Sequence, residues 1–172
     1  MDTAHRLSIL VQGVSAWLGF SPVPTDPVER AARVEALYAD ARTGFPEVVE
    51  VRAEAVAAAV ASGTDLVLVD VRTEAEQAVS MLPHAVPAGV IEREPGPWVG
   101  RRLVAYCTIG YRSGLWARDQ GARGLTVENL AGGVLAWSWA GGRFVADGAP
   151  TTTVHVYGPT WDLLAPGLTS TW

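Results

Sequence analysis

The segment with the clearest chemical potential is the run at residues 106–113, which reads Tyr-Cys-Thr-Ile-Gly-Tyr-Arg-Ser. Cys107 is the only cysteine of the chain, and it directly follows a predicted strand at 102–106 whose residues after Arg102 are typical of a buried parallel strand. Arg112 comes shortly after it, and a helix is predicted to begin at Ser113. Because binding sites in open parallel sheets lie beyond the carboxyl ends of the strands, the sequence predicts a site around Cys107.

The loop that follows Cys107 is suited to stabilising a negative charge. A short turn between strand and helix can direct successive backbone N–H groups inward, and the helix adds partial positive charge at its N-terminus. Gly110 allows a backbone angle that other residues resist, and Arg112 supplies a full positive charge. We therefore expect Cys107 to be held as a thiolate, the nucleophilic form of the side chain. The alternative is an inert buried thiol, the usual state of a lone cysteine.

Asp70 and Arg72 stand at the end of a second apolar run, residues 66–71. In a parallel sheet this end shares an edge with Cys107. One interpretation is that Arg72 or Arg112 contacts an anionic substrate while Asp70 orients the loop. The other is an ion pair that caps the sheet edge. The residues favour this structural role for Asp70 and leave both roles open for Arg72.

The elements that must position these residues alternate between strands and helices. Strands are predicted at residues 48–51, 66–71, 85–91, 102–106 and 125–130. Helices are predicted at residues 54–61, 73–80, 113–122 and 134–140. Such alternation indicates βαβ units, a parallel sheet and right-handed crossovers.

The flanking segments have a different character. Residues 1–47 are predicted to form a helical N-terminal extension, with Asp26 as an N-cap and Pro27 in the first turn of one of its helices. Residues 48–145 form the predicted α/β domain. Residues 146–172 are rich in Thr, Pro and Gly, and we interpret them as an irregular C-terminal tail that packs on the domain.

Over residues 48–145 the sequence resembles the rhodanese-like sulfurtransferases. The resemblance rests on four ordered motifs, Leu-Val-Asp-Val-Arg at 68–72, Leu-Pro-His-Ala at 82–85, the cysteine loop at 107–113, and Ala-Gly-Gly-Val-Leu-Ala-Trp at 131–137. It implies an α/β fold with about five parallel strands and helices on both faces of the sheet. It also implies that Cys107 carries sulfur as a persulfide.

The resemblance and the position of Asp70 and Arg72 at the same sheet edge together give a set of expected site residues. Cys107 and Arg112 are the expected catalytic residues, and Asp70 is expected to support them. The residues expected to bind the substrate are Thr108, Ile109, Gly110, Tyr111, Ser113 and Arg72.

The implied reaction is the transfer of sulfane sulfur from thiosulfate or a persulfide to a thiol, to cyanide or to an acceptor protein. We expect no cofactor and no metal, since one cysteine cannot form an internal disulfide or a cysteine-based zinc site and the three histidines are dispersed. One alternative is a non-catalytic rhodanese-like module that carries sulfur or binds a partner. A cysteine phosphatase is disfavoured, because phosphatases of this fold have five residues between Cys and Arg and this loop has four.

Composition narrows the class of protein further. The 172 residues carry a formal net charge of -5 and no lysine, which makes a general nucleic-acid-binding protein a poor interpretation. No run reaches the roughly 18–20 apolar residues that cross a bilayer. The most apolar stretch, residues 7–20, is interpreted as an amphipathic helix in preference to a signal peptide. We therefore expect a cytoplasmic protein with no membrane partner.

Overall fold

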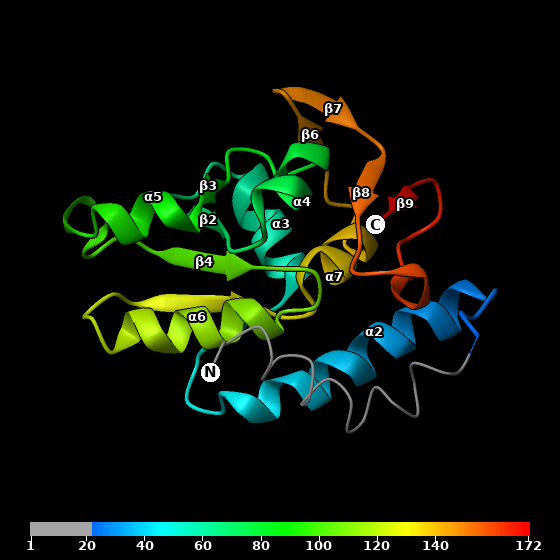
Figure 1. Cartoon of the computed structure of the whole chain (residues 1–172), viewed down its shortest axis with the longest axis horizontal. Coiled ribbons are helices and arrows are strands. Elements are labelled where there is room, and N and C mark those ends of the chain that lie inside the picture. The colour runs from blue at the N-terminus through cyan, green and yellow to red at the C-terminus, as the bar shows by residue number, and fades with distance from the viewer. Residues whose placement is uncertain (1–21) are drawn as a thin grey trace.

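The structure, a computed structural model, describes residues 22–172, so the helix expected at 7–20 lies outside the described residues. Its centre is a sheet of five parallel strands in the order β1-β5-β4-β2-β3 (Figure 1). The strands are β1 (Glu50–Val51), β2 (Val67–Asp70), β3 (Val86–Pro87), β4 (Leu103–Tyr106) and β5 (Val127–Leu130). The predicted parallel α/β architecture is confirmed.

Helices cover both faces of the sheet. They are α2 (Pro27–Ala41), α3 (Ala53–Ala61), α4 (Glu74–Val79), α5 (Ala88–Arg93), α6 (Tyr111–Gly121) and α7 (Gly133–Trp139). Three short 3₁₀ turns are η1 (Arg42–Gly44), η2 (Gly96–Trp98) and η3 (Pro159–Trp161).

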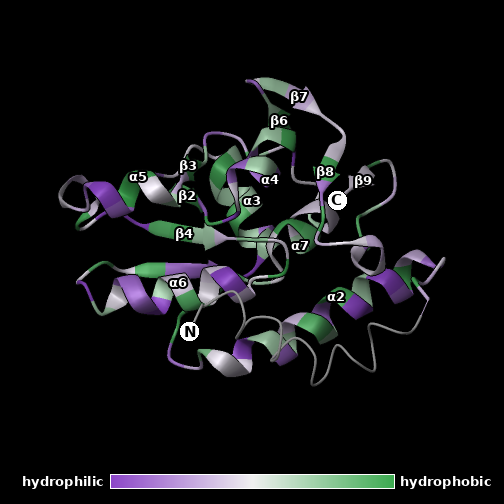
Figure 2. Ribbon diagram, viewed as in Figure 1, coloured by the Kyte–Doolittle hydropathy of each residue, from purple (hydrophilic) through white to green (hydrophobic). Residues whose placement is uncertain are grey.

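The hydrophobic core divides into two layers because successive strand residues point to opposite faces. Leu68 and Val104 belong to a layer that includes apolar side chains of α2, α3 and α7. Val69 and Ala105 belong to the other layer, with side chains of α5 and α6. Figure 2 shows the matching pattern, with apolar colour on the central strand β4 and polar colour recurring along the outer helices.

Two helix starts follow directly from their capping residues. The Asp26 carboxylate accepts hydrogen bonds from the backbone N–H groups of Val28 and Glu29, at 2.9 and 3.0 Å, and so caps α2. Thr73 and Glu76 form a capping box at the start of α4, in which each side chain accepts a hydrogen bond from the other residue's backbone.

The structure differs from the sequence prediction at 85–91 and at the start of α6. Strand β3 ends at Pro87, and the residues that follow form α5. Proline cannot donate a ladder hydrogen bond, and the buried Ala88 and Ile91 are spaced for one helical face. Helix α6 begins at Tyr111, two residues earlier than predicted, because Gly110 turns the chain with a φ of 97°.

The C-terminal segment contains more regular structure than expected. Strands β6 (Phe144–Ala146) and β7 (Ala149–Thr151) form an antiparallel hairpin, and β8 (Thr153–His155) pairs in parallel with β9 (Thr169–Thr171). The segment buries a row of apolar side chains in the same layer as α7, namely Val154, Val156, Leu163 and Leu164. None of the helices within residues 22–172 has the length and apolar character needed to span a membrane.

Candidate functional site

Cys107 lies at the point where the sheet changes direction. From β2 the chain continues outward to β3, whereas from β4 it continues to β5 on the other side, so the junction of β2 and β4 is a switch point of the kind where α/β sheets bind ligands. Cys107 follows the last residue of β4, and its side chain is buried. In Figure 1 the carboxyl end of β4 points toward the part of the molecule that contains β8 and η3.

The conformation of the loop after Cys107 is fixed by hydrogen bonds that neighbouring residues donate to its carbonyl groups. The backbone N–H of Val134, at the start of α7, donates to the Cys107 carbonyl at 2.9 Å, and that of Leu135 donates to the Thr108 carbonyl at 3.3 Å. The Asn129 side-chain amide donates to the Gly110 carbonyl at 2.9 Å. Because these neighbours take up the carbonyl groups, the loop can turn the Gly110 N–H toward the sulfur, which accepts its hydrogen bond at 3.2 Å.

These contacts favour the ionised form of Cys107. Burial alone would raise the pKa of the thiol, since it penalises the charged form. The positive charge of Arg112, the amide and hydroxyl of Ser113 and the amide of Gly110 act in the opposite direction and outweigh burial. The net result is a Cys107 pKa below its ordinary value, so the surroundings of the sulfur favour the thiolate.

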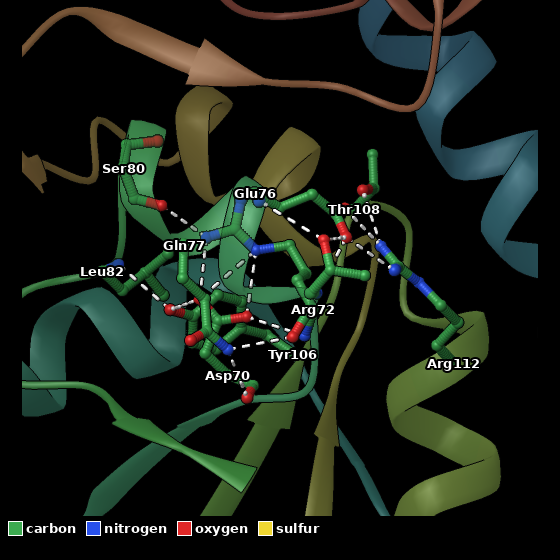
Figure 3. A network of polar contacts seen from close by, with 10 residues as sticks. Asp70, Arg72, Glu76, Gln77, Ser80, Leu82, Tyr106, Thr108 and Arg112 are labelled. Atoms are coloured by element: carbon green, nitrogen blue, oxygen red, sulfur yellow. Dashed lines mark hydrogen bonds and ion pairs between the residues drawn. The ribbon is translucent and has the colours of Figure 1, made fainter. Parts of the chain in front are cut away.

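Arg112 is held by a carboxylate that the sequence analysis did not assign to the site. Its guanidinium forms two hydrogen bonds with Glu76 of α4, at 2.8 and 2.6 Å, and a longer contact of 3.4 Å to the Thr108 hydroxyl (Figure 3). Burial would raise the pKa of Glu76, but the bonds and charge of Arg112 together with the capping contacts of Thr73 lower it to about 2. The only hint in the sequence is the capping box, which places Glu76 at the carboxyl edge of the sheet.

Arg72 and Asp70 form a separate, buried ion pair beside the site. The Arg72 guanidinium lies 2.7 Å from the Asp70 carboxylate, and both side chains are 0% exposed. Asp70 also accepts a hydrogen bond of 2.6 Å from the Tyr106 hydroxyl, and Arg72 donates to the Ser80 carbonyl. The structure places the Arg72 guanidinium in this sealed ion pair and outside the pocket wall, so the geometry favours the structural role of Arg72 over the expected contact with the substrate. Both residues stabilise the sheet edge that carries Cys107.

A pocket opens above the cysteine loop. Its walls are Cys107, Thr108, Ile109, Tyr111, Arg112, Tyr157 and Trp161. Five of these lie in the predicted loop, whereas Gly110 and Ser113 lie outside the wall and act on the sulfur through their hydrogen-bonding groups. Tyr157 and Trp161 come from the C-terminal segment, and their rings meet edge-to-face at 5.8 Å. Nothing in the local sequence near Cys107 signals their presence.

The position of Trp161 is fixed by the chain around it. The Trp139 indole of α7 donates to the Leu163 carbonyl at 2.9 Å, and Arg30 of α2 forms an ion pair with Asp162 at 3.2 Å. These contacts hold η3 against the domain and so place an aromatic wall opposite the cysteine loop. Within residues 22–172, no group of three or more His, Cys, Asp or Glu side chains is arranged to bind a metal ion.

Comparison with known proteins agrees with this architecture. A sulfurtransferase from Allochromatium vinosum is 33% identical over 107 residues, which cover 56% of this chain and 94% of the relative. The solved rhodanese-like domain from an Anabaena species is similar with a TM-score of 0.51 at 17% identity, and the match covers 58% of this chain and 80% of that one. A rhodanese-related protein from Thermoplasma volcanium gives a TM-score of 0.49 at 17% identity, covering 58% of this chain and 99% of that one. No family model matches the chain.

The fold and the site define an α/β domain with a buried cysteine in a hydrogen-bonding loop at the switch point of a parallel sheet. The Allochromatium relative matches over nearly its whole length, and the Anabaena structure shares the fold. This chain belongs to the rhodanese-like family, and the resemblance predicted from the four motifs is confirmed.

Proposed function

We propose that the protein is a sulfurtransferase that carries sulfane sulfur as a persulfide on Cys107. The observation that supports this most strongly is the position of the Cys107 sulfur, which accepts a hydrogen bond from the Gly110 N–H and lies in the wall of a pocket beside Arg112. These surroundings lower the pKa of the Cys107 thiol. The relationship to a protein named sulfurtransferase supports the same reaction class.

The reaction has two half-reactions. The Cys107 thiolate attacks the outer sulfur of a donor, a new S–S bond forms, and the remainder of the donor leaves with the electron pair of the broken bond. An acceptor thiolate, or cyanide, then attacks the outer sulfur of the Cys107 persulfide, and Cys107 leaves as a thiolate. The same amides and Arg112 stabilise Cys107 as nucleophile and as leaving group, so one arrangement lowers both barriers.

The test is to incubate the protein with a sulfane sulfur donor and measure its intact mass. We expect a gain equal to one sulfur atom, which disappears when an excess of cyanide or a thiol is added. Because Cys107 is the only cysteine, the Cys107→Ser variant has no other thiol and must show no gain. A gain that persists in this variant would exclude Cys107 as the carrier. Loading without repeated turnover would indicate a sulfur-carrying module in place of an enzyme.

A further inference from the structure

The charge of the pocket disfavours an anionic donor. Arg112 is the only charged side chain in the pocket wall within the described part of the chain, and its guanidinium already binds the Glu76 carboxylate through two hydrogen bonds. It also faces the Cys107 thiolate that it stabilises. Before a donor binds, the positive charge of Arg112 is therefore already opposed by the negative charges of Glu76 and the Cys107 thiolate.

Among residues 22–172, no second cation lines the pocket to offset these negative charges. The nearby Arg72 is sealed at 0% exposure in its ion pair with Asp70. The chain as a whole carries a formal net charge of -5, which opposes the approach of a further anion. A dianion such as thiosulfate would therefore add two negative charges to a site that has no free positive charge among the described residues.

The pocket offers apolar surface instead. Ile109 and Tyr111 form the loop side of the wall, and Tyr157 and Trp161 form the opposite side. The Tyr157 side chain is 60% exposed and stands against the Trp161 ring, so the pair presents aromatic surface at the entrance. Aromatic rings of this kind bind apolar groups by burying area and by ring stacking.

We propose that the sulfur donor of this protein is a low-molecular-weight persulfide that reacts in its neutral, protonated form R–S–SH, whose R group is uncharged and aliphatic or aromatic, in preference to thiosulfate, which is a dianion. This inference rests on the proposed function and specifies its substrate. The R group packs between Trp161 and the Ile109 side of the loop while the outer sulfur meets Cys107. The Cys107 thiolate bonds to the outer sulfur, the S–S bond of R–S–SH breaks, and R–S⁻ leaves with the electron pair of that bond. The transferred sulfur remains on Cys107 as S–SH, and no external oxidant or reductant takes part.

The test compares the second-order rates at which benzyl persulfide and thiosulfate load Cys107, measured by intact mass. Trp161→Ala removes half of the aromatic wall, and we expect it to slow loading from benzyl persulfide by about tenfold while loading from thiosulfate changes less than about twofold. Tyr157→Ala is a second variant at an exposed position, so a folding defect in one variant leaves the other informative. Trp172→Ala is the matched control, because Trp172 is exposed in the same segment and lies outside the pocket wall.

A charge variant tests the electrostatic half of the inference. Glu76→Gln keeps a side-chain oxygen that can cap α4, but it removes the carboxylate charge that partly neutralises the Arg112 guanidinium. We expect it to speed loading from thiosulfate about tenfold relative to benzyl persulfide. Wild-type protein that loads faster from thiosulfate, or variants that change both donors equally, would overturn the inference and leave the proposed function intact. Absence of loading from either donor would overturn the proposed function itself.

Discussion

At the scale of single residues, the site depends on a balance of charges around one sulfur atom. Burial of Cys107 opposes ionisation, and Arg112 together with nearby hydrogen-bond donors reverses that effect. Arg112 is itself shared, because Glu76 holds it at 2.6 Å. The carboxylate therefore fixes the guanidinium in place and at the same time reduces the positive charge that the thiolate experiences.

This balance predicts opposite shifts for two variants. The rate of alkylation by iodoacetamide follows the thiolate, so it rises with pH and levels off above the pKa of Cys107. Arg112→Gln removes the cation that favours the thiolate and should move the midpoint of this rise to higher pH. Glu76→Gln removes the opposing anion and should move the midpoint to lower pH. Shifts in the same direction for both variants would contradict the proposed charge balance.

A second prediction concerns the buried pair of Asp70 and Arg72. Asp70→Asn leaves the Arg72 guanidinium sealed without its counter-charge, and we expect a loss of about 3–5 kcal/mol in the free energy of unfolding, measured with urea. The control is Glu128→Gln, which breaks the more exposed pair of Glu128 and Arg102 and should cost about 1 kcal/mol or less. Equal losses of unfolding free energy in the two variants would show that the burial of the Asp70–Arg72 pair does not increase the cost of breaking it.

Contacts between residues that are close in the sequence can be predicted from the sequence, whereas contacts between residues that are far apart in it cannot. Cys107 and Arg112 belong to one loop, so their relationship is visible in the spacing of the motif. Glu76 lies on another helix, and only the folded chain brings it to Arg112. The sequence does not distinguish the two roles of Arg72, because the burial of its guanidinium depends on how Asp70, Tyr106 and Ser80 surround it in the folded chain.

At the scale of elements, the turn between β4 and α6 determines how the sulfur is presented. Gly110 adopts a φ of 97°, and a Cβ atom there would lie 2.8 Å from the Tyr38 ring and 3.1 Å from the Leu130 carbonyl. The close packing of α2 and β5 against this glycine keeps its amide directed at Cys107. The sequence indicated the need for glycine at this turn, but the contact with α2 involves a helix far away in the chain.

A pair of glycine variants separates the effect of this packing from the effect of backbone angle. Gly110→Ala combines an unfavourable φ with two close contacts, so we expect it to lower the unfolding free energy by more than about 2 kcal/mol and to raise the pKa of Cys107. Gly124→Ala has a similar φ of 89° but no neighbouring atoms within 4 Å, so it should cost only about 1–2 kcal/mol and leave that pKa unchanged. Urea unfolding and the pH profile of alkylation measure both effects. Identical behaviour of the two variants would argue against a role of the packing.

Elements defined by strong local signals were predicted well, and those that depend on distant contacts were not. The start of α4 follows from Thr73 and Glu76, which cap it through contacts within a single turn. The apolar residues of 85–91 suit a strand as well as a helix. Because Pro87 ends the strand and Ala88 and Ile91 pack into the core, the residues after Pro87 form the helix α5. The short strands β8 and β9 pair across more than a dozen residues, which leaves no periodic signal in the sequence.

At the scale of the whole molecule, the C-terminal segment is part of the domain that it covers. Leu163 and Leu164 are fully or almost fully buried in the layer formed by α2, α3 and α7. The backbone near Leu163 is also tied to α7 through the Trp139 indole and through the Ser138 hydroxyl, which accepts from the Ala165 N–H at 3.0 Å. The composition of residues 146–172 suggested a tail, because Thr, Pro and Gly are common in irregular chain.

We therefore propose that the C-terminal segment and the rest of the domain unfold as one cooperative unit, and a variant at Leu163 tests this. Leu163→Ala leaves a cavity in the shared core, so we expect a loss of about 2–5 kcal/mol in the free energy of unfolding of the entire domain. Tryptophan fluorescence and far-UV circular dichroism should then report one coincident transition, shifted equally. If the segment were an independent appendage, the variant would loosen it alone: proteases would cut near residue 160, Trp161 would leave the pocket, and the main transition would stay where it is in the wild type. The coincident shift is expected because the side chains that wall the pocket and those that hold the sheet belong to one packed layer.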